Sequence, residues 1–307
     1  MGRYVIRRLL QMIPVFIGST FLIFFMVYAL GDPVAALFGD REPDPATAAR
    51  IRAELHLDEP LWKQYLLYMG QIFRGDFGTA FNGRRVTELM ASAFPVTLRL
   101  TLVAIVIEVL IGITLGVVSG LKRGRPLDTG LLVLTLVVIS VPTFVSGYLL
   151  QYLLGVQWGW VRPSVSPDAR FDELLLPGTV LALVSLAYVT RLSRTSIAEN
   201  IRADYVRTAI AKGLPRHRVI TRHVLRNSLI PVVTFIGADI GSLMGGAIVT
   251  ERIFNIHGVG YQLYQGILRN NAPTVVGFVT ILVIVFLVAN LLVDLLYAVL
   301  DPRIRYA

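Results

Sequence analysis

Six apolar segments, each long enough to cross a lipid bilayer, constrain this chain more than any other feature. A hydrocarbon core about 30 Å thick is crossed by a helix of roughly 17 to 25 mostly apolar residues. Segments of this kind are predicted at residues 9–30, 97–121, 127–155, 174–190, 227–250 and 274–300. Lipid offers the backbone no hydrogen-bond partner, so only helices or closed barrels can span it. We therefore expect an all-α polytopic membrane protein with six transmembrane helices.

Composition supports a membrane protein and limits its chemistry. Hydrophobic residues make up 55% of the chain and charged residues 16%, with a mean hydropathy of +0.66. A net charge of +9 on such a chain indicates contact with anionic lipid at the cytoplasmic face rather than with nucleic acid. There is no cysteine, and the four histidines (His56, His217, His223 and His257) are scattered. We therefore predict neither a disulfide nor a metal site.

The first apolar segment has a rival interpretation as a secretory signal peptide. Arg3, Arg7 and Arg8 precede it, as basic residues precede the apolar region of a signal. The apolar segment is 22 residues long and no A-x-A cleavage site follows it. Both features favour an uncleaved first transmembrane helix.

The distribution of charge predicts the topology. Segments assigned to the cytoplasm carry 17 Lys/Arg and 4 acidic residues, whereas segments assigned to the outside carry 11 Lys/Arg and 13 acidic residues. The cytoplasmic set is residues 1–8, 122–126, 191–226 and 301–307, together with Asp128 at the start of the third span, and the external set is 31–96, 156–173 and 251–273. This bias follows the positive-inside rule and places both termini in the cytoplasm.

These segments divide the chain into three parts. Residues 1–30 form the amino-terminal end and first span, residues 31–96 an extracytoplasmic insertion, and residues 97–307 a five-helix core. Within the insertion, residues 46–54 and 61–73 are predicted to be short helices. A small catalytic domain is the alternative, but the insertion lacks paired carboxylates and a nucleophile beside a base. We expect a compact helical cap.

The most distinctive polar segment lies between the fourth and fifth spans, at residues 191–226. It holds nine Lys/Arg against Glu199 and Asp204. A short amphipathic helix is predicted because four residues recur at helical spacing, namely Ile197, Ile201, Tyr205 and Thr208. Gly213 is suited to the left-handed conformation that ends a helix, and Pro215 should prevent the helix from resuming. The segment resembles a docking helix, although any cytoplasmic loop of a membrane protein can be basic.

Several motifs resemble a known family. Arg207-Thr208-Ala209, followed after three residues by Gly213, is similar to the EAA loop of ABC-importer permeases, although Arg207 stands in place of the usual Glu. The longer segments HLDEPLWKQYLLYM, RGDFG, DYVRTAIAKGLPRHRVITRHVLRNSLIP and GGAIVTERIFNIHGVGYQLYQGILRNNAP resemble the dipeptide/oligopeptide/nickel branch of these permeases. His257 replaces a usual Pro, and Leu30 replaces the Pro that usually precedes the GDP at residues 31–33.

The resemblance implies a type I ABC-importer permease of a bacterial inner membrane. It implies a second, similar permease subunit, two ABC ATPases and an extracytoplasmic peptide-binding protein as partners. Its ATPase-coupling residues would be Tyr205, Arg207, Thr208, Ala209 and Gly213. The sequence contains no G-x-x-x-x-G-K-[ST] motif, so we expect a non-enzymatic subunit without a cofactor, with ATP and Mg used by the partner ATPases.

Polar and small residues inside the spans are candidates for helix packing or for the transport path. Glu108, Asp239 and Asp294 lie within predicted spans, where an ionisable group is costly unless it faces protein or water. The fifth span also carries small residues at four-residue spacing, which permits close helix contact: Gly237, Gly241 and Gly245. We expect these residues to serve packing, with Asp239 a candidate for lining the path.

The external segment 251–273 is a candidate contact for the binding protein. It is predicted as a loop rich in Gly and Asn, and its candidate residues are Asn255, His257, Gly258 and Gly260. A loop that only closes the helix bundle is the alternative. At the level of function, the alternatives are a proton-coupled transporter acting alone and a membrane anchor. The cargo is left open among dipeptides, longer peptides, glutathione and nickel chelates.

Overall fold

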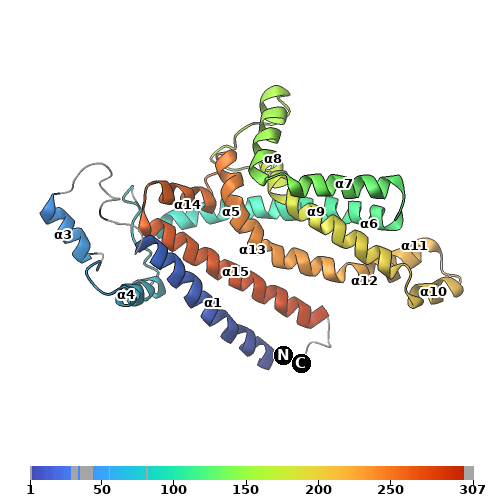
Figure 1. The fold of residues 1–307 in the computed structure, drawn as a ribbon, viewed down its shortest axis with the longest axis horizontal. Coiled ribbons are helices and arrows are strands. Elements are labelled where there is room, and N and C mark those ends of the chain that lie inside the picture. The colour runs from blue at the N-terminus through green and yellow to red at the C-terminus, as the bar shows by residue number, and fades with distance from the viewer. Residues whose placement is uncertain (1, 29–33, 35–43, 55, 81, 301–307) are drawn as a thin grey trace. The chain divides into compact units, whose positions relative to one another are not determined.

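The structure is a computed structural model that describes residues 2–28, 34, 44–54, 56–80 and 82–300 (Figure 1). The described residues form helices joined by turns, with one isolated bridge between Thr79 and Arg85 and no strand. The GDP motif at residues 31–33 and the carboxyl-terminal tail 301–307 lie outside these ranges. The expected all-α fold is confirmed for the described part of the chain.

Within the described residues, five helices are long and apolar enough to cross a membrane, and a bent helix pair supplies a sixth candidate. The spans are Val5–Tyr28, Val86–Leu121, Leu175–Asn200, Ile230–Ile253 and Ala272–Leu295, and the bent pair is Pro126–Ser140 with Thr143–Gln157. The number of predicted spans is therefore confirmed, with differences in where two of them begin or bend.

The chain divides into two compact units, residues 1–97 with 257–288 and residues 98–256 with 289–307. The first unit contains helices α1 (Gly2–Tyr28), α3 (Pro45–Glu54), α4 (Leu61–Phe73), the start of α5 (Val86–Ile107), α14 (Val259–Leu268) and most of α15 (Ala272–Leu300). The second unit begins with the end of α5, the π-helical turn η1 (Glu108–Gly112), α6 (Ile113–Leu121), α7 (Pro126–Ser140), α8 (Thr143–Leu150) and the π-helical segment η2 (Gln151–Gln157). It continues with α9 (Leu175–Asn200) and the short helices α10 (Asp204–Ala211), α11 (Arg216–Arg218), the π-helical η3 (Val219–Leu225) and α12 (Arg226–Ser228). It is completed by α13 (Ile230–Ile253) and the end of α15.

Aromatic and hydroxyl side chains join the helices of the first unit. Phe24 of α1 packs edge-on against Tyr65 of α4, with ring centroids 5.7 Å apart. The Thr20 hydroxyl lies 2.8 Å from the Tyr65 hydroxyl, and the Tyr68 hydroxyl lies 3.4 Å from that of Thr280 on α15. The predicted short helices at 46–54 and 61–73 are present as α3 and α4, so the helical character of the insertion is confirmed.

The second span differs from its prediction, because α5 begins at Val86 and not at Thr97. Pro95 lies inside the helix, although a proline removes one backbone hydrogen bond and usually ends a helix. The first turns of α5 are held by burial, with Val86 at 0% and Leu89 at 3% exposure. Tertiary packing therefore outweighs the local signal of Pro95.

The third span also differs, because the segment predicted as one helix is two helices bent by 101°. The bend falls at Val141 and Pro142. Val141 is extended, with ψ 124°, as expected for a residue that precedes proline. Pro142 then precedes the first turn of α8.

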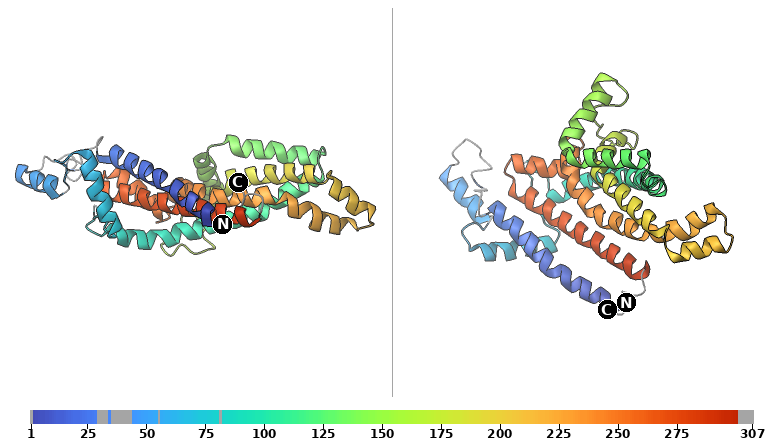
Figure 2. Two further views of the ribbon diagram at one scale, coloured as in Figure 1. Left: turned by 90° about the horizontal axis from the view of Figure 1, so that it is seen from below. Right: turned by 45° about the vertical axis from the view of Figure 1, so that its right-hand side comes forward.

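Helix α9 is the centre of the second unit and packs on α6, α7, α8 and α13. Helices α6, α7 and α9 lie side by side (Figures 1 and 2). Val180, Val189 and Ile197 of α9 are fully buried. This helix connects the buried interior of the unit to the basic segment that follows it.

Candidate coupling site

The basic segment forms a compact group of short helices after α9. The chain leaves α9 at Asn200, turns, and forms the eight-residue helix α10. Gly213 follows with φ +77°, the left-handed conformation that glycine adopts without strain. Helix α10 ends before Gly213, as predicted, and a separate helix, α11, starts directly after Pro215, which was not predicted. Proline at this place starts a new helix because its φ of −65° already suits one.

A small apolar core holds this group together. Its buried members come from α9, α10 and η3, and they are Ile197, Val206, Ala209, Val219 and Val224. Val117 and Leu121 of α6 pack against the same core. Helix α10 is therefore fixed to the ends of α9 and α6 within the second unit.

The predicted amphipathic helix is partly wrong. Ile197 belongs to α9 and Ile201 to the turn, so neither shares a helix with Tyr205 and Thr208. Val206 and Ala209 form the buried side of α10. The helical spacing of these side chains in the sequence does not change at the turn of residues 201–203, so it does not reveal that one helix ends and another begins there.

The exposed face of α10 includes Tyr205, Arg207, Thr208 and Ile210, and the two end residues Asp204 and Ala211 are exposed as well. Ile210 is 61% exposed, an apolar side chain on a strongly basic segment. The Tyr205 hydroxyl donates a hydrogen bond to Oδ1 of Asn200, which attaches this face to the last residue of α9. Of the predicted coupling residues, the structure brings Tyr205, Arg207 and Thr208 to the surface and buries Ala209 at 5% exposure. Sequence reasoning did not single out Ile210.

A close helix contact lies near this site, between α6 and α9. A Cβ atom added to Gly116 would lie 2.4 Å from Cβ of Ser193, and one added to Gly120 would lie 2.8 Å from Cβ of Ile197. Gly112, one turn earlier, meets Val189 at 2.9 Å. These glycines lie four residues apart, which is the spacing that permits close helix approach in membranes. The same spacing in the sequence could have identified this contact, which we call the glycine seam of α6 and α9.

The predicted glycine stripe of α13 has a less uniform environment. A Cβ at Gly237 would lie 2.8 Å from Cγ2 of Val293 in α15, whereas one at Gly245 would have no described atom within 4 Å. Gly241 is half-buried. Close approach within the described chain is thus seen at Gly237, and Gly245 faces open space.

The acidic residues predicted inside spans are placed in helices. Glu108 is fully buried in η1, and neither of its carboxylate oxygens has a hydrogen-bond partner among the described residues. Asp239 is half-buried in α13, and its Oδ2 also has no such partner. Asp294 is half-buried in α15. Within the described ranges, no three acidic, histidine or cysteine side chains gather in a way that could hold a metal.

The predicted external loop at 251–273 is wrong as a loop, because α14 occupies ten of its residues. Val259, Leu263 and Gly266 recur at helical spacing on the buried side of α14, and their burial outweighs the turn signals of the Gly and Asn residues. Asn255 has φ +53° and is exposed, as is His257, whereas Gly258 and Gly260 are buried. The ring of His257 lies edge-on to Tyr261, 4.6 Å away.

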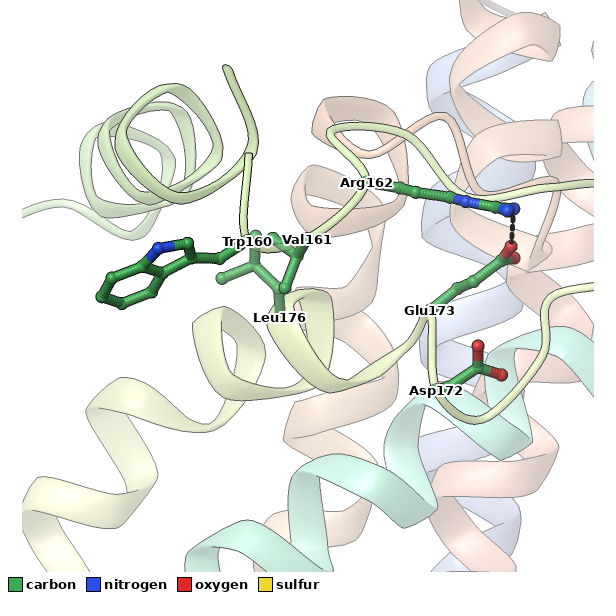
Figure 3. A pocket seen from close by; sticks show the side chains of 6 residues that line it. All are labelled: Trp160, Val161, Arg162, Asp172, Glu173 and Leu176. Carbon is green, nitrogen blue, oxygen red and sulfur yellow. Dashed lines mark hydrogen bonds and ion pairs between the residues drawn. The ribbon is translucent and has the colours of Figure 1, made fainter. Parts of the chain in front are cut away.

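A second site, missed from the sequence, lies in the segment between η2 and α9 (Figure 3). A pocket of about 230 Å³ is lined by Trp160, Val161, Arg162, Asp172, Glu173 and Leu176. Nη1 of Arg162 lies 2.7 Å from Oε1 of Glu173, and Oε2 of Glu173 accepts the Ser166 backbone N–H at 3.0 Å. Hydrogen bonds from the Ser166 hydroxyl and N–H, aided by Arg162, lower the pKa of Glu173. Glu173 is therefore held mainly by Ser166, and Arg162 adds an ion pair.

The fold and the site define a class, namely a helical multi-span membrane protein with a basic, partly apolar helix outside its spans. Comparisons with known proteins give the family. A model of the "Binding-protein-dependent transport system inner membrane component" family matches residues 112–306, and a model of its N-terminal part matches residues 1–101. The chain belongs to this family, and it is an ABC-importer permease of the dipeptide/oligopeptide type.

Curated relatives match over their whole length. The chain is 38% identical to the dipeptide transport system permease protein DppB of Escherichia coli strain K12, covering 100% of this chain and 99% of the relative. It is 36% identical to the di/tripeptide transport system permease protein DppB of Pseudomonas aeruginosa (99% and 98% covered). It is also 38% identical to the glutathione transport system permease protein GsiC of Salmonella choleraesuis (100% of both chains).

A solved structure shares the fold. One chain of the crystal structure of an amino acid ABC transporter with histidines aligns with a TM-score of 0.54. The alignment covers 68% of this chain and 93% of the other, at 19% sequence identity. This likeness supports the type I permease fold of the spans.

Proposed function

We propose that this chain forms half of the pore of an ATP-driven importer for dipeptides and longer peptides. A second, similar permease completes the pore, two ABC ATPases drive it, and an external binding protein delivers the peptide. The chain itself carries no cofactor, and ATP and Mg are used by the ATPases. ATP-dependent closure of the ATPases pushes on α10, and the spans alternate between inward-open and outward-open arrangements.

The exposed face of α10 is the observation that carries this proposal. The apolar core under α10 fixes the helix while Tyr205, Arg207 and Ile210 remain exposed. An exposed apolar side chain flanked by polar ones is the usual composition of a docking surface. The names of the full-length relatives support di- and tripeptides as cargo, with glutathione as the alternative.

The partners are tested by purification of the tagged chain from its native host in mild detergent. We expect a second permease, ABC ATPases and a binding protein to co-purify. Uptake into vesicles should require ATP. A chain that purifies alone, and whose uptake ignores ATP but collapses with the proton gradient, would instead be a secondary transporter.

The role of α10 is tested at Gly213. Its φ of +77° is strained for a β-branched residue by roughly 1–3 kcal/mol, so Gly213→Val should displace the end of α10. We expect this variant to lose substrate-stimulated ATP hydrolysis in the assembled complex. Gly213→Asn is the matched control, because asparagine tolerates this conformation and a Cβ here meets no described atom within 4 Å. Normal stimulation in Gly213→Val would refute the assignment.

A further inference from the structure

A buried ion pair joins the start of α7 to α9, close to the basic segment. Nε of Arg194 lies 2.7 Å from Oδ1 of Asp128, and its Nη2 lies 2.8 Å from Oδ2. The Asp128 side chain is 2% exposed and that of Arg194 is 18% exposed. Asp128 also accepts hydrogen bonds from the Ser119 hydroxyl and from the Gly124 N–H at 2.9 Å. Four donors therefore hold one carboxylate in place.

The four donor groups belong to three residues, which lie in different elements around the turn between α6 and α7. Ser119 lies in α6, Gly124 in the turn itself, and Arg194 in α9. Gly124 has φ +80°, which directs the turn back so that its N–H reaches the first turn of α7. The glycine seam brings α6 close to α9, since a Cβ at Gly120 would lie 2.9 Å from the carbonyl oxygen of Arg194. The carboxylate thus fixes three helices at one point.

The type of interaction favours a positional role over a stabilising one. A buried ion pair gains little net stability, because the attraction is offset by removing both charges from water. A planar guanidinium that binds a carboxylate through two nitrogens instead fixes the distance and the orientation between the two side chains. A well-packed apolar pair would stabilise the turn as well, but it would not define the register of α7 on α9.

The pair is also connected to the exposed face of α10. Arg194 lies one turn before Ile197, which is buried in the same core as Val206 and Ala209 of α10. Asn200, at the end of α9, accepts the hydrogen bond from Tyr205. A displacement of α10 therefore acts on the end of α9, and Arg194 is the residue through which α9 binds Asp128 of α7.

We propose that Asp128 and Arg194 are positioning residues that pass movement of α10 through α9 into α7, the first half of the bent span. This inference rests on the proposed function, because it assumes that α10 receives the movement of an ATPase. It extends that function from the docking helix to a second element, with α7 moving together with α9.

The test measures how many ATP molecules are hydrolysed per peptide imported. The wild-type complex, with its ATPases and binding protein, is reconstituted in vesicles with alanyl-alanine as the probe and glutathione as the second probe. Arg194→Lys keeps the charge but loses the two-nitrogen geometry. We expect this variant to assemble and hydrolyse ATP, with the ratio of ATP to peptide raised roughly tenfold. A lower thermal midpoint with an unchanged ratio would make the pair merely structural and overturn the proposal.

A second variant keeps the test decisive if Arg194→Lys does not assemble. The chain has no cysteine, so Asp128→Cys/Arg194→Cys can be bridged by a short bifunctional thiosulfonate reagent and released by a reductant. The bridged form should return the ratio to the wild-type value, and reduction should raise it again in the same sample. An unchanged ratio on bridging and release would contradict the proposal. Absence of ATP-dependent uptake in the wild type would instead contradict the proposed function.

Discussion

At the scale of single residues, Glu173 shows how one side chain fixes an external segment. Its side chain is only 5% exposed, whereas Arg162, its ionic partner, is 74% exposed. An ion pair with an exposed partner contributes little. The hydrogen bonds from the hydroxyl and the N–H of Ser166 therefore carry most of the interaction, and they are the main cause of the lowered pKa of Glu173.

This lowered pKa predicts a dependence on pH. The ionised form is favoured in the folded state, so its stabilising contribution is complete above the unfolded pKa of about 4.3. It is lost as the pH falls through the lower pKa of the folded state. We expect Glu173→Gln to lower the thermal midpoint at neutral pH and to remove part of the acid dependence.

The control for this prediction is Asp172→Asn. Asp172 pairs with Arg170 at 3.2 Å, and both side chains are more than 60% exposed. Because an exposed ion pair contributes little to stability, its removal should leave the thermal midpoint at neutral pH unchanged. Identical profiles for Glu173→Gln and the wild type would show that the contacts of Glu173 do not stabilise the folded segment.

At the scale of elements, the seam between α6 and α9 leaves no room for a side chain at Gly116. An added Cβ would lie 2.4 Å from Cβ of Ser193 and 2.6 Å from the carbonyl oxygen of Thr190. A backbone atom cannot move aside without displacing its helix. Gly116→Ala should therefore destabilise the protein by roughly 1–3 kcal/mol through overpacking, measured as a lower thermal midpoint in detergent.

Gly130→Ala in α7 is the matched control, because no described atom lies within 4 Å of its added Cβ. Alanine is a better helix former than glycine by about 1 kcal/mol, so this variant should keep or raise the thermal midpoint. Equal midpoints for Gly116→Ala and Gly130→Ala would mean that α6 and α9 do not approach as closely as the structure shows.

Sequence patterns predicted the helices better than the contacts between them. Hydropathy predicted all the candidate spans found in the described residues, because length and apolar content directly reflect the thickness of the bilayer. It placed the start of the second span eleven residues late, and it missed the bend at Pro142. The early start of α5 depends on tertiary packing, and the bend depends on a single proline turn. Neither is detected by hydropathy averaged over many residues.

The same distinction applies to the candidate site. The basic segment and Gly213 were recognised from local composition and turn chemistry. Local composition did not predict that Val206 and Ala209 of α10 are buried and that Ile210 is exposed, because this depends on Val219 and Val224 of η3. The Asp128–Arg194 pair joins residues 66 positions apart, and periodicity in one helix carries no information about a partner in another.

At the scale of the whole molecule, the orientation in the membrane is predicted from the distribution of charge. The predicted cytoplasmic segments hold 17 of the 29 Lys/Arg, and the positive-inside rule keeps such segments in the cytoplasm. The division into residues 1–30, 31–96 and 97–307, which assigns the insertion to the outside, depends on this sidedness and stays a prediction.

Single-cysteine variants can test this orientation without background, because the chain has no cysteine of its own. Arg123 lies in the turn between α6 and α7, Ser164 lies between η2 and α9, and both are exposed. A membrane-impermeant maleimide applied to cells with a permeable outer envelope should label Ser164→Cys at once. It should label Arg123→Cys only after the membrane is opened with detergent. The reverse order would invert the topology and place α10 on the side where no ATPase can reach it.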